Sequence, residues 1–289
     1  MGAATDGAPR TTPCWADVTL PDVEAGKRFY GGLFGWTFEN GDPEAGPYAR
    51  ALHEGAEVAA LAPKPDGRMP TAWCVYFSSP DAEATAERIR AEGGQVVTGP
   101  ARVGGYGTLL LAADPGGAVF GVWQAAAHRG FGKRGTPGAY GWAEVYTREP
   151  AAVDAFYERV FGLTAHDLGK PEGTGEPDRS GEPGEPTESG QGDGFDYAVW
   201  TPAGEPLAPE NAVGGRAVMN EASFPAAMPA HFLVYFVVAD CDEACRAARR
   251  LGGRIRREAR DSAYGRFAVL TDDQGADFAV VDPTRAVEG

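Results

Sequence analysis

Two acidic residues stand at equivalent places in the sequence, each two positions after a tryptophan: Trp15-Ala-Asp17 and Trp142-Ala-Glu144. Side chains of an extended strand alternate between its two faces, so each tryptophan shares a face with its acid. A carboxylate beside an aromatic ring can orient a flat ligand, pair with a cationic amine, or act as a general acid or base. Asp17 and Glu144 are therefore the candidate catalytic residues. The alternative for both is a strand acid that is hydrogen-bonded to the backbone.

Histidines and cysteines, which could bind a transition metal ion, are few in the sequence. The histidines are His53, His128, His166 and His231, and the cysteines are Cys14, Cys74, Cys241 and Cys245. The cysteines have no zinc-type pairing with histidines and suit neither CxxC redox chemistry nor a disulfide, so we expect ordinary buried thiols.

Both tryptophan-acid pairs belong to a segment that occurs twice. The motifs WADVTL and FYGGLFGW, between Trp15 and Trp36, recur as WAEVYT and FYERVFGL, between Trp142 and Leu163. Further on, Tyr76-Phe77 recurs as Tyr235-Phe236. The chain is thus one module written twice, so each candidate position can be compared with its counterpart in the other copy.

The repeat sets the domain boundaries. We expect a flexible N-terminus at residues 1–13, a first module over 14–124, a linker over 125–140 and a second module over 141–283. The second copy also contains an extra stretch, 168–194, made mostly of Gly, Pro, Glu and Ser. Such a stretch cannot offset its ordering entropy by burying apolar surface, so we predict a disordered insertion there.

Within each copy the pattern reads strand, helix and three strands, and then the same again. In the first copy the expected strands are 14–20, 37–39, 48–53, 58–61, 73–77, 95–98, 109–112 and 119–123, and the helices end at Gly35 and at Gly93-Gly94. The prediction is therefore an α+β chain built from four βαβββ units.

These features resemble the vicinal oxygen chelate superfamily, which includes glyoxalase I, bleomycin-resistance proteins and extradiol dioxygenases. The resemblance rests on the paired βαβββ units, the acid in the first strand, the FY..(L/V)FG helix end, the GG pair, and a YG followed by D(P)xG.xF. It covers nearly all of both copies. It implies that two units form a cup-shaped mixed sheet whose concave face holds the ligand, in many members together with a divalent metal bound by His, Gln or Glu.

The positions where the resemblance places metal ligands carry other residues here. They are Trp15 and Trp142, then Cys74 or Val75 and Leu233 or Val234, and finally Gly121 and Ala279. Only Cys74 could bind a metal, and it would be alone. We therefore predict cups without a metal and without another cofactor.

The predicted cups are rich in aromatic residues instead. Tryptophans and tyrosines recur along the predicted strands, and alternation should place about half of them in the core. The candidate ligand-binding residues are Trp15, Asp17, Trp73, Tyr106, Trp123, Trp142, Glu144, Trp200 and Tyr264, within a wider set that includes Tyr48, Tyr76, Tyr146, Tyr197 and Tyr235.

Charge and motifs narrow the function classes. The net charge of -15 argues against nucleic acid or an anionic membrane as a partner. The apolar runs are too short for a membrane span and the N-terminus does not resemble a secretory signal, so we expect a cytoplasmic protein. The sequence lacks a GxSxG elbow, a P-loop, a nucleotide-binding glycine fingerprint and an HExxH motif.

The leading hypothesis is metal-independent binding of a hydrophobic aromatic natural product. The Ala, Gly, Pro and Arg-rich usage resembles that of high-GC actinobacterial proteins, which favours antibiotic biosynthesis, in an auxiliary or product-binding role, or self-resistance by sequestration. A polycyclic polyketide such as an anthracycline would suit an aromatic cup, and a biosynthetic enzyme is a candidate partner. The alternative is a metal-dependent lyase, isomerase or dioxygenase. Its metal site would be shifted from the positions that the resemblance implies to Glu144, His231 and Asp277. The chain could act as a monomeric pseudo-dimer or as a homodimer.

Overall fold

The computed structural model describes residues 11–41, 48–64, 70–168, 196–221 and 224–287. Most of the predicted flexible N-terminus, residues 1–10, and all but Leu168 of the predicted insertion at 168–194 lie outside the described residues. Pro13, which we assigned to the N-terminal segment, is the first residue of a strand. No helix of the described residues is long and apolar enough to cross a membrane.

The first module follows the predicted order of elements, and the strand predicted at 95–98 continues to Val103. Its elements are β1 (Pro13–Leu20), α1 (Val23–Phe34), β2 (Thr37–Asn40), β3 (Ala49–His53), β4 (Ala56–Pro63), β5 (Ala72–Ser78), α2 (Ala82–Ala91), β6 (Gln95–Val103), β7 (Gly107–Ala113) and β8 (Val119–Ala125).

The second module repeats this order. Its elements are β9 (Tyr140–Thr147), α3 (Pro150–Phe161), β10 (Leu163–Asp167), β11 (Tyr197–Pro202), β12 (Gly214–Val218), β13 (His231–Val237), α4 (Cys241–Arg250), β14 (Arg254–Ser262), β15 (Gly265–Thr271) and β16 (Asp277–Asp282). A short 3-10 helix, Pro283–Arg285, follows.

Local sequence signals fix where the helices begin and end. The side chain of Asp22 accepts a hydrogen bond from the backbone N–H of Ala25 at the start of α1, and Asp81 and Asp240 cap α2 and α4 in the same way. Gly35 ends α1 in the left-handed conformation, with φ of 72°, which costs little without a side chain.

Each module forms one eight-stranded mixed sheet. The strand order is β2-β3-β4-β1-β5-β8-β7-β6 in the first and β10-β11-β12-β9-β13-β16-β15-β14 in the second. The two units of a module meet where the first strands pair antiparallel, β1 with β5 and β9 with β13. Each cup is therefore completed within its own module, and the predicted α+β fold with two cup-shaped mixed sheets is confirmed.

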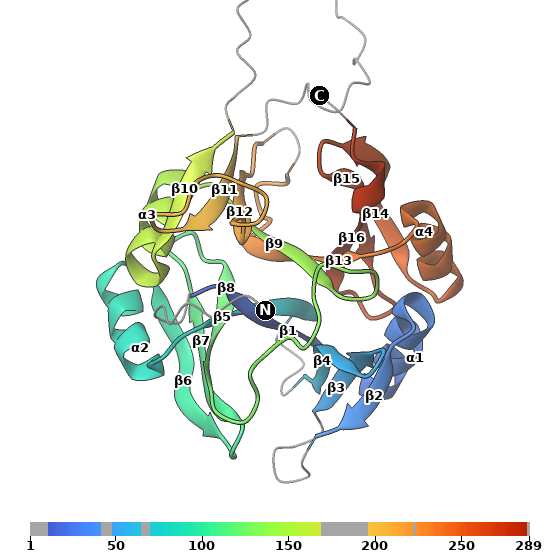
Figure 1. The fold of residues 1–289 in the computed structure, drawn as a ribbon, viewed down its shortest axis with the longest axis horizontal. Coiled ribbons are helices and arrows are strands. Elements are labelled where there is room, and N and C mark those ends of the chain that lie inside the picture. Colours follow the sequence, from blue (N-terminus) through green and yellow to red (C-terminus); the bar gives the residue numbers. More distant parts are fainter. Residues whose placement is uncertain (1–10, 42–47, 65–69, 169–195, 222–223, 288–289) are drawn as a thin grey trace, which may run out of the picture.

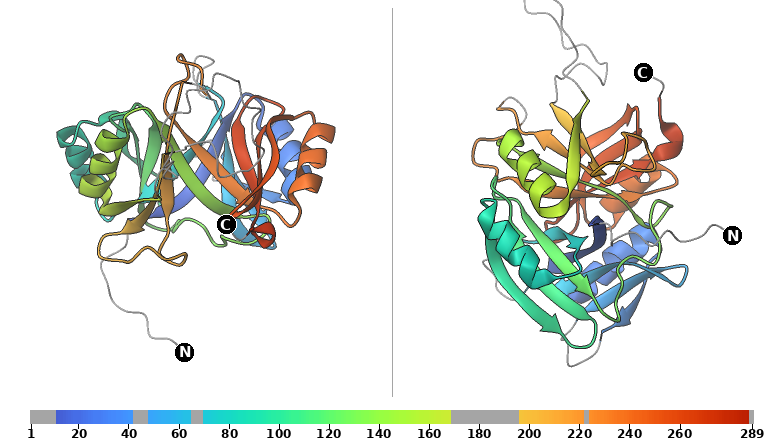
Figure 2. Two further views of the ribbon diagram at one scale, coloured as in Figure 1. Left: turned by 90° about the horizontal axis from the view of Figure 1, so that it is seen from above. Right: turned by 60° about the vertical axis from the view of Figure 1, so that its left-hand side comes forward.

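The two sheets pack through their convex faces, where β5 contacts β13 directly, and the helices flank this contact (Figure 2). Figure 2 (left) shows the helices in two pairs at the outer sides, and α1 contacts α4 while α2 contacts α3. Aromatic rings join the modules: Phe34 of α1 lies 5.1 Å from Phe236 of β13 between ring centroids, and Tyr30 donates a hydrogen bond to Asp272 at 2.9 Å. The central core thus lies on the convex side of both sheets, and the concave face of each sheet is not part of it.

Trp73 and Trp200 belong to this core, contrary to the prediction that they line a cup. Trp73 pairs in register with Val18, which faces the helices, and its indole donates to the hydroxyl of Tyr30 at 3.1 Å. Trp200 is 1% exposed and packs on Tyr157 of α3, with ring centroids 4.4 Å apart. The sequence alone did not indicate on which face of a strand each tryptophan would lie.

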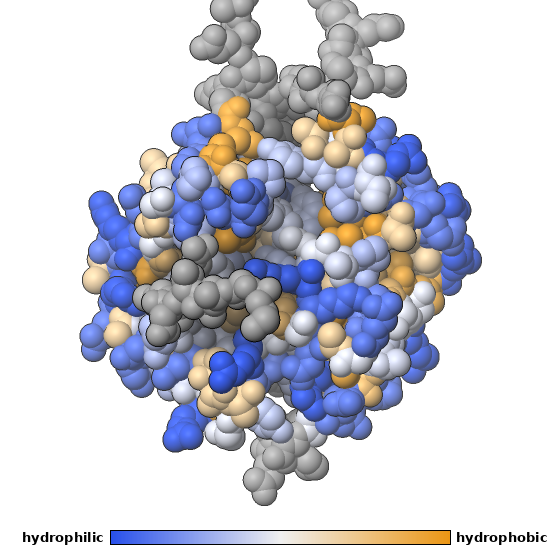
Figure 3. All heavy atoms as spheres, in the orientation of Figure 1, coloured by the Kyte–Doolittle hydropathy of each residue, from blue (hydrophilic) through white to orange (hydrophobic). Residues whose placement is uncertain are grey.

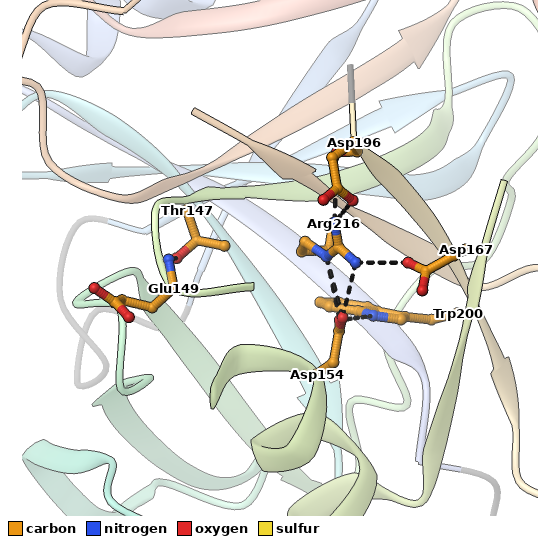
Figure 4. Close-up of polar contacts among 7 residues, drawn as sticks. All are labelled: Thr147, Glu149, Asp154, Asp167, Asp196, Trp200 and Arg216. Carbon is orange, nitrogen blue, oxygen red and sulfur yellow. Dashed lines mark hydrogen bonds and ion pairs between the residues drawn. The ribbon is translucent and has the colours of Figure 1, made fainter. Parts of the chain in front are cut away.

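A buried arginine fastens the outer strands of the second sheet to α3. Arg216 of β12 is 3% exposed, and its guanidinium forms ion pairs with Asp154, Asp167 and Asp196 (Figure 4). Asp167 ends β10 and Asp196 precedes β11, so one side chain ties together the two chain segments that flank residues 169–195. Three carboxylates compensate the charge of the buried guanidinium.

Candidate ligand-binding site

The concave face of the first sheet, which we call cup 1, holds a hydrogen-bonded chain of a tryptophan, a tyrosine and an acid. The Trp15 indole Nε1 donates to the hydroxyl of Tyr48 at 2.8 Å, and that hydroxyl donates to Asp17 at 3.0 Å. The hydroxyl of Tyr76 also donates to Asp17, at 3.0 Å. Burial raises the pKa of the Asp17 carboxyl to about 6, although the hydrogen bonds from both phenols lower it.

The concave face of the second sheet, cup 2, repeats this chain. The Trp142 indole donates to Tyr197 at 3.1 Å, and the hydroxyls of Tyr146 and Tyr235 each donate to Glu144 at 2.6 Å. Burial raises the pKa of all three phenols well above the ordinary value, and the nearby charge of Glu144 adds to this effect. The duplication therefore preserved a network rather than a single residue.

Glycine makes room for this network at two positions. A side chain at Gly215, which lies beside Glu144 in the sheet, would place its Cβ 2.4 Å from the Tyr197 hydroxyl. In cup 1 a Cβ on Gly121 would lie 2.0 Å from the ring of Tyr76. Such distances are incompatible with a side chain, so the phenols reach their acids across bare backbone.

The linker between the modules fills cup 1. The His128 ring lies edge-on to Trp15 with centroids 4.5 Å apart, and the Phe131 ring lies 5.5 Å from the same indole. The Trp123 indole donates to the His128 carbonyl at 2.8 Å, and the Phe131 N–H donates to the Cys14 carbonyl at 2.8 Å. Figure 1 shows the linker crossing the open side of the first sheet. The chain thus occupies its own first cup.

Cup 2 is open instead. A cavity of about 660 Å³ lies over its concave face, and the molecular surface is hollowed there, in the upper half of Figure 3. This volume is within the range of small-molecule sites, roughly 300–1,000 Å³. Its floor consists of Trp142, Glu144, Tyr146, Tyr197 and Tyr235.

The walls of the cavity in cup 2 are mostly apolar. Val199 and Ala217 line the β11–β12 side together with Leu207, and Phe267 and Val281 line the β15–β16 side. Two arginines of β14, Arg257 and Arg260, and Tyr264 of the loop before β15 also border it. A flat apolar ligand could therefore lie between these walls, with its polar groups directed to the floor or to the arginines.

The residues present do not fit a divalent metal. Among the described residues, no three His, Cys, Asp or Glu side chains lie close enough together to hold a metal ion. In cup 1 the ring of Tyr76 covers Gly121, the position of the expected closing ligand. In cup 2 the corresponding position is Ala279, which pairs with Tyr235 in parallel register and has no side-chain atom that could bind a metal.

The alternative metal set is also not brought together. His231 stacks on Tyr146 with ring centroids 5.3 Å apart, and its Nδ1 lies 2.9 Å from the Pro229 carbonyl. Asp277 accepts a hydrogen bond from Thr271 at the start of β16. Only Glu144 of this set belongs to the cavity floor.

The other candidate residues divide between the two cups. Trp15, Tyr106 and Trp123 belong to or pack on the cluster in cup 1, where Asp17 accepts a hydrogen bond from Tyr76. Trp142, Glu144 and Tyr264 line the cavity in cup 2. The sequence reasoning did not single out Arg257, Arg260 or Phe131. Nothing in the sequence pattern indicated that linker residues would enter a cup.

Comparisons with known proteins agree with this architecture. The family model "Glyoxalase/Bleomycin resistance protein/Dioxygenase superfamily" matches residues 14–122 and 139–280. The chain is 35% identical to "Anthracycline biosynthesis protein DnrV" of Streptomyces peucetius, over 93% of this chain and 92% of the relative. It is 34% identical to "Putative glyoxylase CFP32" of Mycobacterium bovis, over 94% and 95%. The Mn(II)-bound glyoxalase from Novosphingobium aromaticivorans has a similar fold, with a TM-score of 0.57 and 17% identity over 96% of this chain and 86% of that one.

Proposed function

The chain belongs to the glyoxalase, bleomycin resistance protein and dioxygenase superfamily, and from this premise we propose that cup 2 binds a flat, hydrophobic aromatic natural product without a metal. The observation that carries the proposal is the open cavity of about 660 Å³ with mostly apolar walls and a polar aromatic floor. Such a concave apolar site with a few convergent polar groups is typical of small-molecule binding.

The floor dictates which polar groups a ligand needs. The phenol protons of Tyr146 and Tyr235 are engaged with Glu144, so these hydroxyls offer only their oxygen lone pairs to a ligand. The Trp142 N–H is likewise engaged with Tyr197. The floor therefore accepts hydrogen bonds and favours a ligand that presents hydroxyl or amine donors. Against the apolar walls, the same hydroxyl or amine groups of a ligand would lose their hydrogen bonds to water without gaining a partner, which costs binding free energy.

The relatives suggest where such a ligand comes from. The similarity to an anthracycline biosynthesis protein extends over nearly the whole of both chains. We therefore propose a role in antibiotic biosynthesis, in which the protein holds an aromatic polyketide of the anthracycline type for a biosynthetic enzyme or carries the product away. Sequestration of the finished compound in self-resistance would use the same cup.

A titration of tryptophan fluorescence tests this proposal. Doxorubicin, added in the presence of EDTA, should quench the fluorescence saturably. Trp142→Phe should weaken binding by about 3- to 10-fold, because it reduces ring contact and removes the N–H that orients Tyr197. Trp15→Phe is the matched control, because it removes the equivalent indole from the filled cup and should leave the affinity unchanged.

Two outcomes would count against cup 2. The first is the absence of saturable quenching by doxorubicin and by a panel of polycyclic aromatic natural products. The second is equal weakening by the two tryptophan substitutions, which would show that the indole of cup 2 has no special part in binding.

A further inference from the structure

We propose that Arg257 forms an anion-recognition subsite in the wall of cup 2, so that the bound ligand carries an acidic oxygen, either a carboxylate or an acidic phenol. This inference rests on the proposed function and adds to it the chemical class of the ligand. Its basis is the placement of two β14 arginines on the concave face of a sheet whose protein carries a net charge of -15.

A bulge in β14 places both arginines on one face. Residues 257 and 260 are three positions apart, so a regular strand would direct them to opposite faces. The register with β15 shifts here: Arg257 pairs with Val269, and Arg260 pairs with Phe267. Three steps on β14 therefore match two steps on β15, as in a β-bulge. Val269 and Phe267 pack on the aromatic cluster of cup 2, and the two arginines point the same way.

The charge of Arg257 is not compensated by an ion pair within the cavity. Glu144 is the only carboxylate among the described residues that line the cavity, and it already accepts hydrogen bonds from two phenols. The neighbouring Arg256 is paired with Asp277 at 3.6 Å. Arg257, by contrast, forms no ion pair with a carboxylate of the described part of the chain.

The field of Arg257 reaches the cavity floor. Burial raises the pKa of Tyr146 first, and the charge of Glu144 raises it further, while the positive charge of Arg257 lowers it. Arg260 reinforces the same wall, because its guanidinium lies 4.9 Å from the centroid of the Phe267 ring. An acidic oxygen beside β14 would thus meet a guanidinium whose planar donor group suits two oxygens at once.

The floor and the wall of cup 2 together favour a ligand with different polar groups at two of its edges. The floor accepts hydrogen bonds through Glu144 and its phenols, whereas the β14 wall donates them through Arg257. A flat molecule with an acidic oxygen at one edge and hydroxyl donors at another satisfies both. A neutral molecule of the same shape leaves the arginine without an anionic partner.

Two matched probes test the inference: anthraquinone-2-carboxylate and anthraquinone-2-carboxamide, which share one shape and differ in charge at neutral pH. Calorimetric titration of the full chain should show that the carboxylate binds about 10-fold more tightly than the carboxamide, as expected for hydrogen bonds to a charged group. Arg257→Gln should abolish this preference and leave the carboxamide affinity nearly unchanged. Arg257→Lys, which retains the charge, should keep part of the preference.

Arg254→Gln is the control variant, because Arg254 is exposed on the same strand and does not line the cavity. It should retain the full preference, and added salt should reduce that preference in the wild-type protein. Equal binding of both probes, or a preference that survives Arg257→Gln in a folded variant, would overturn this inference and leave the proposed function standing. Failure of both probes to bind the wild-type protein would count against the proposed function itself and would overturn the inference with it.

Discussion

Replacing Asp17 by asparagine should change how the stability of the protein depends on pH. Asp17 is 6% exposed, and burial raises the pKa of its carboxyl from the ordinary value of 3.8 to about 6, against the lowering effect of its hydrogen bonds from Tyr48 and Tyr76. The folded state therefore holds the proton of Asp17 more tightly than the unfolded state does. Its contribution to stability is fully present below about pH 4 and is lost as the pH rises through about 6.

The size of this effect follows from the pKa difference. At about 1.36 kcal/mol per pKa unit, the shift corresponds to about 3 kcal/mol of lost stability above pH 7. Asp17→Asn cannot ionise, so the free energy of unfolding of the variant relative to wild type should rise by about 2–3 kcal/mol between pH 4 and pH 8. The altered hydrogen bonds to the two phenols add an offset that is constant with pH.

Urea denaturation followed by tryptophan fluorescence measures this difference at each pH. Asp114, whose pKa burial also raises to about 6, is present in both proteins and cancels. Asp242→Asn is the control of opposite sign, because the hydrogen bond from Arg266 lowers the pKa of that exposed carboxyl. A difference between wild type and Asp17→Asn that stays flat from pH 4 to pH 8 would refute the view that Asp17 is buried in the filled cup 1.

Three further substitutions test separate parts of the structure. Arg216→Met should lower the free energy of unfolding by about 2–4 kcal/mol in thermal or urea denaturation, because it leaves partly buried carboxylates without their cation. Arg159→Met is the comparison, because the exposed ion pair of Arg159 with Glu92 should contribute less than about 1 kcal/mol. Similar losses of stability from the two substitutions would contradict this expectation. Gly121→Ala should cost about 1–3 kcal/mol, because its Cβ would displace the Tyr76 ring, and a neutral result would mean that the ring can move aside. Phe131→Ala should empty part of cup 1 and add a second, weak binding site for a small aromatic such as naphthalene; an unchanged stoichiometry in calorimetry would show that the phenylalanine does not fill the cup.

The sequence allowed the fold to be predicted because the module is duplicated. A single Trp-x-acid motif could belong to any strand, but its recurrence together with the FY and FG positions defined the units and their order. The helix ends were predictable for local reasons: Asp22 and Asp81 supply side-chain caps, and Gly35 adopts a left-handed conformation.

The face on which each side chain lies was less predictable. Alternation correctly put Trp15 with Asp17 and Trp142 with Glu144, but it could not choose between core and cup for Trp73. That choice depends on register with the neighbouring strand, which is a tertiary property. The sequence did not indicate that Arg257 and Arg260 share a face, because their spacing suggests opposite faces and the bulge in β14 is not visible in the sequence.

The sequence also did not indicate that cup 1 is filled and that cup 2 is open. Both copies carry the same Trp, Tyr and acid network, and nothing in the repeat distinguishes a filled cup from an open one. The difference arises from the linker, which occurs once in the chain and lies over the first sheet. Duplication thus supplied two similar sites, and the connection between them closed one.

A crystal structure of the full chain with doxorubicin bound tests the central claim most directly. We expect the ring system to lie in cup 2, in contact with Trp142 and with a donor group directed to the Glu144 floor, while the linker stays in place over cup 1. Density for the ligand in cup 1 with the linker displaced, or a ligand held through a metal ion, would contradict the account.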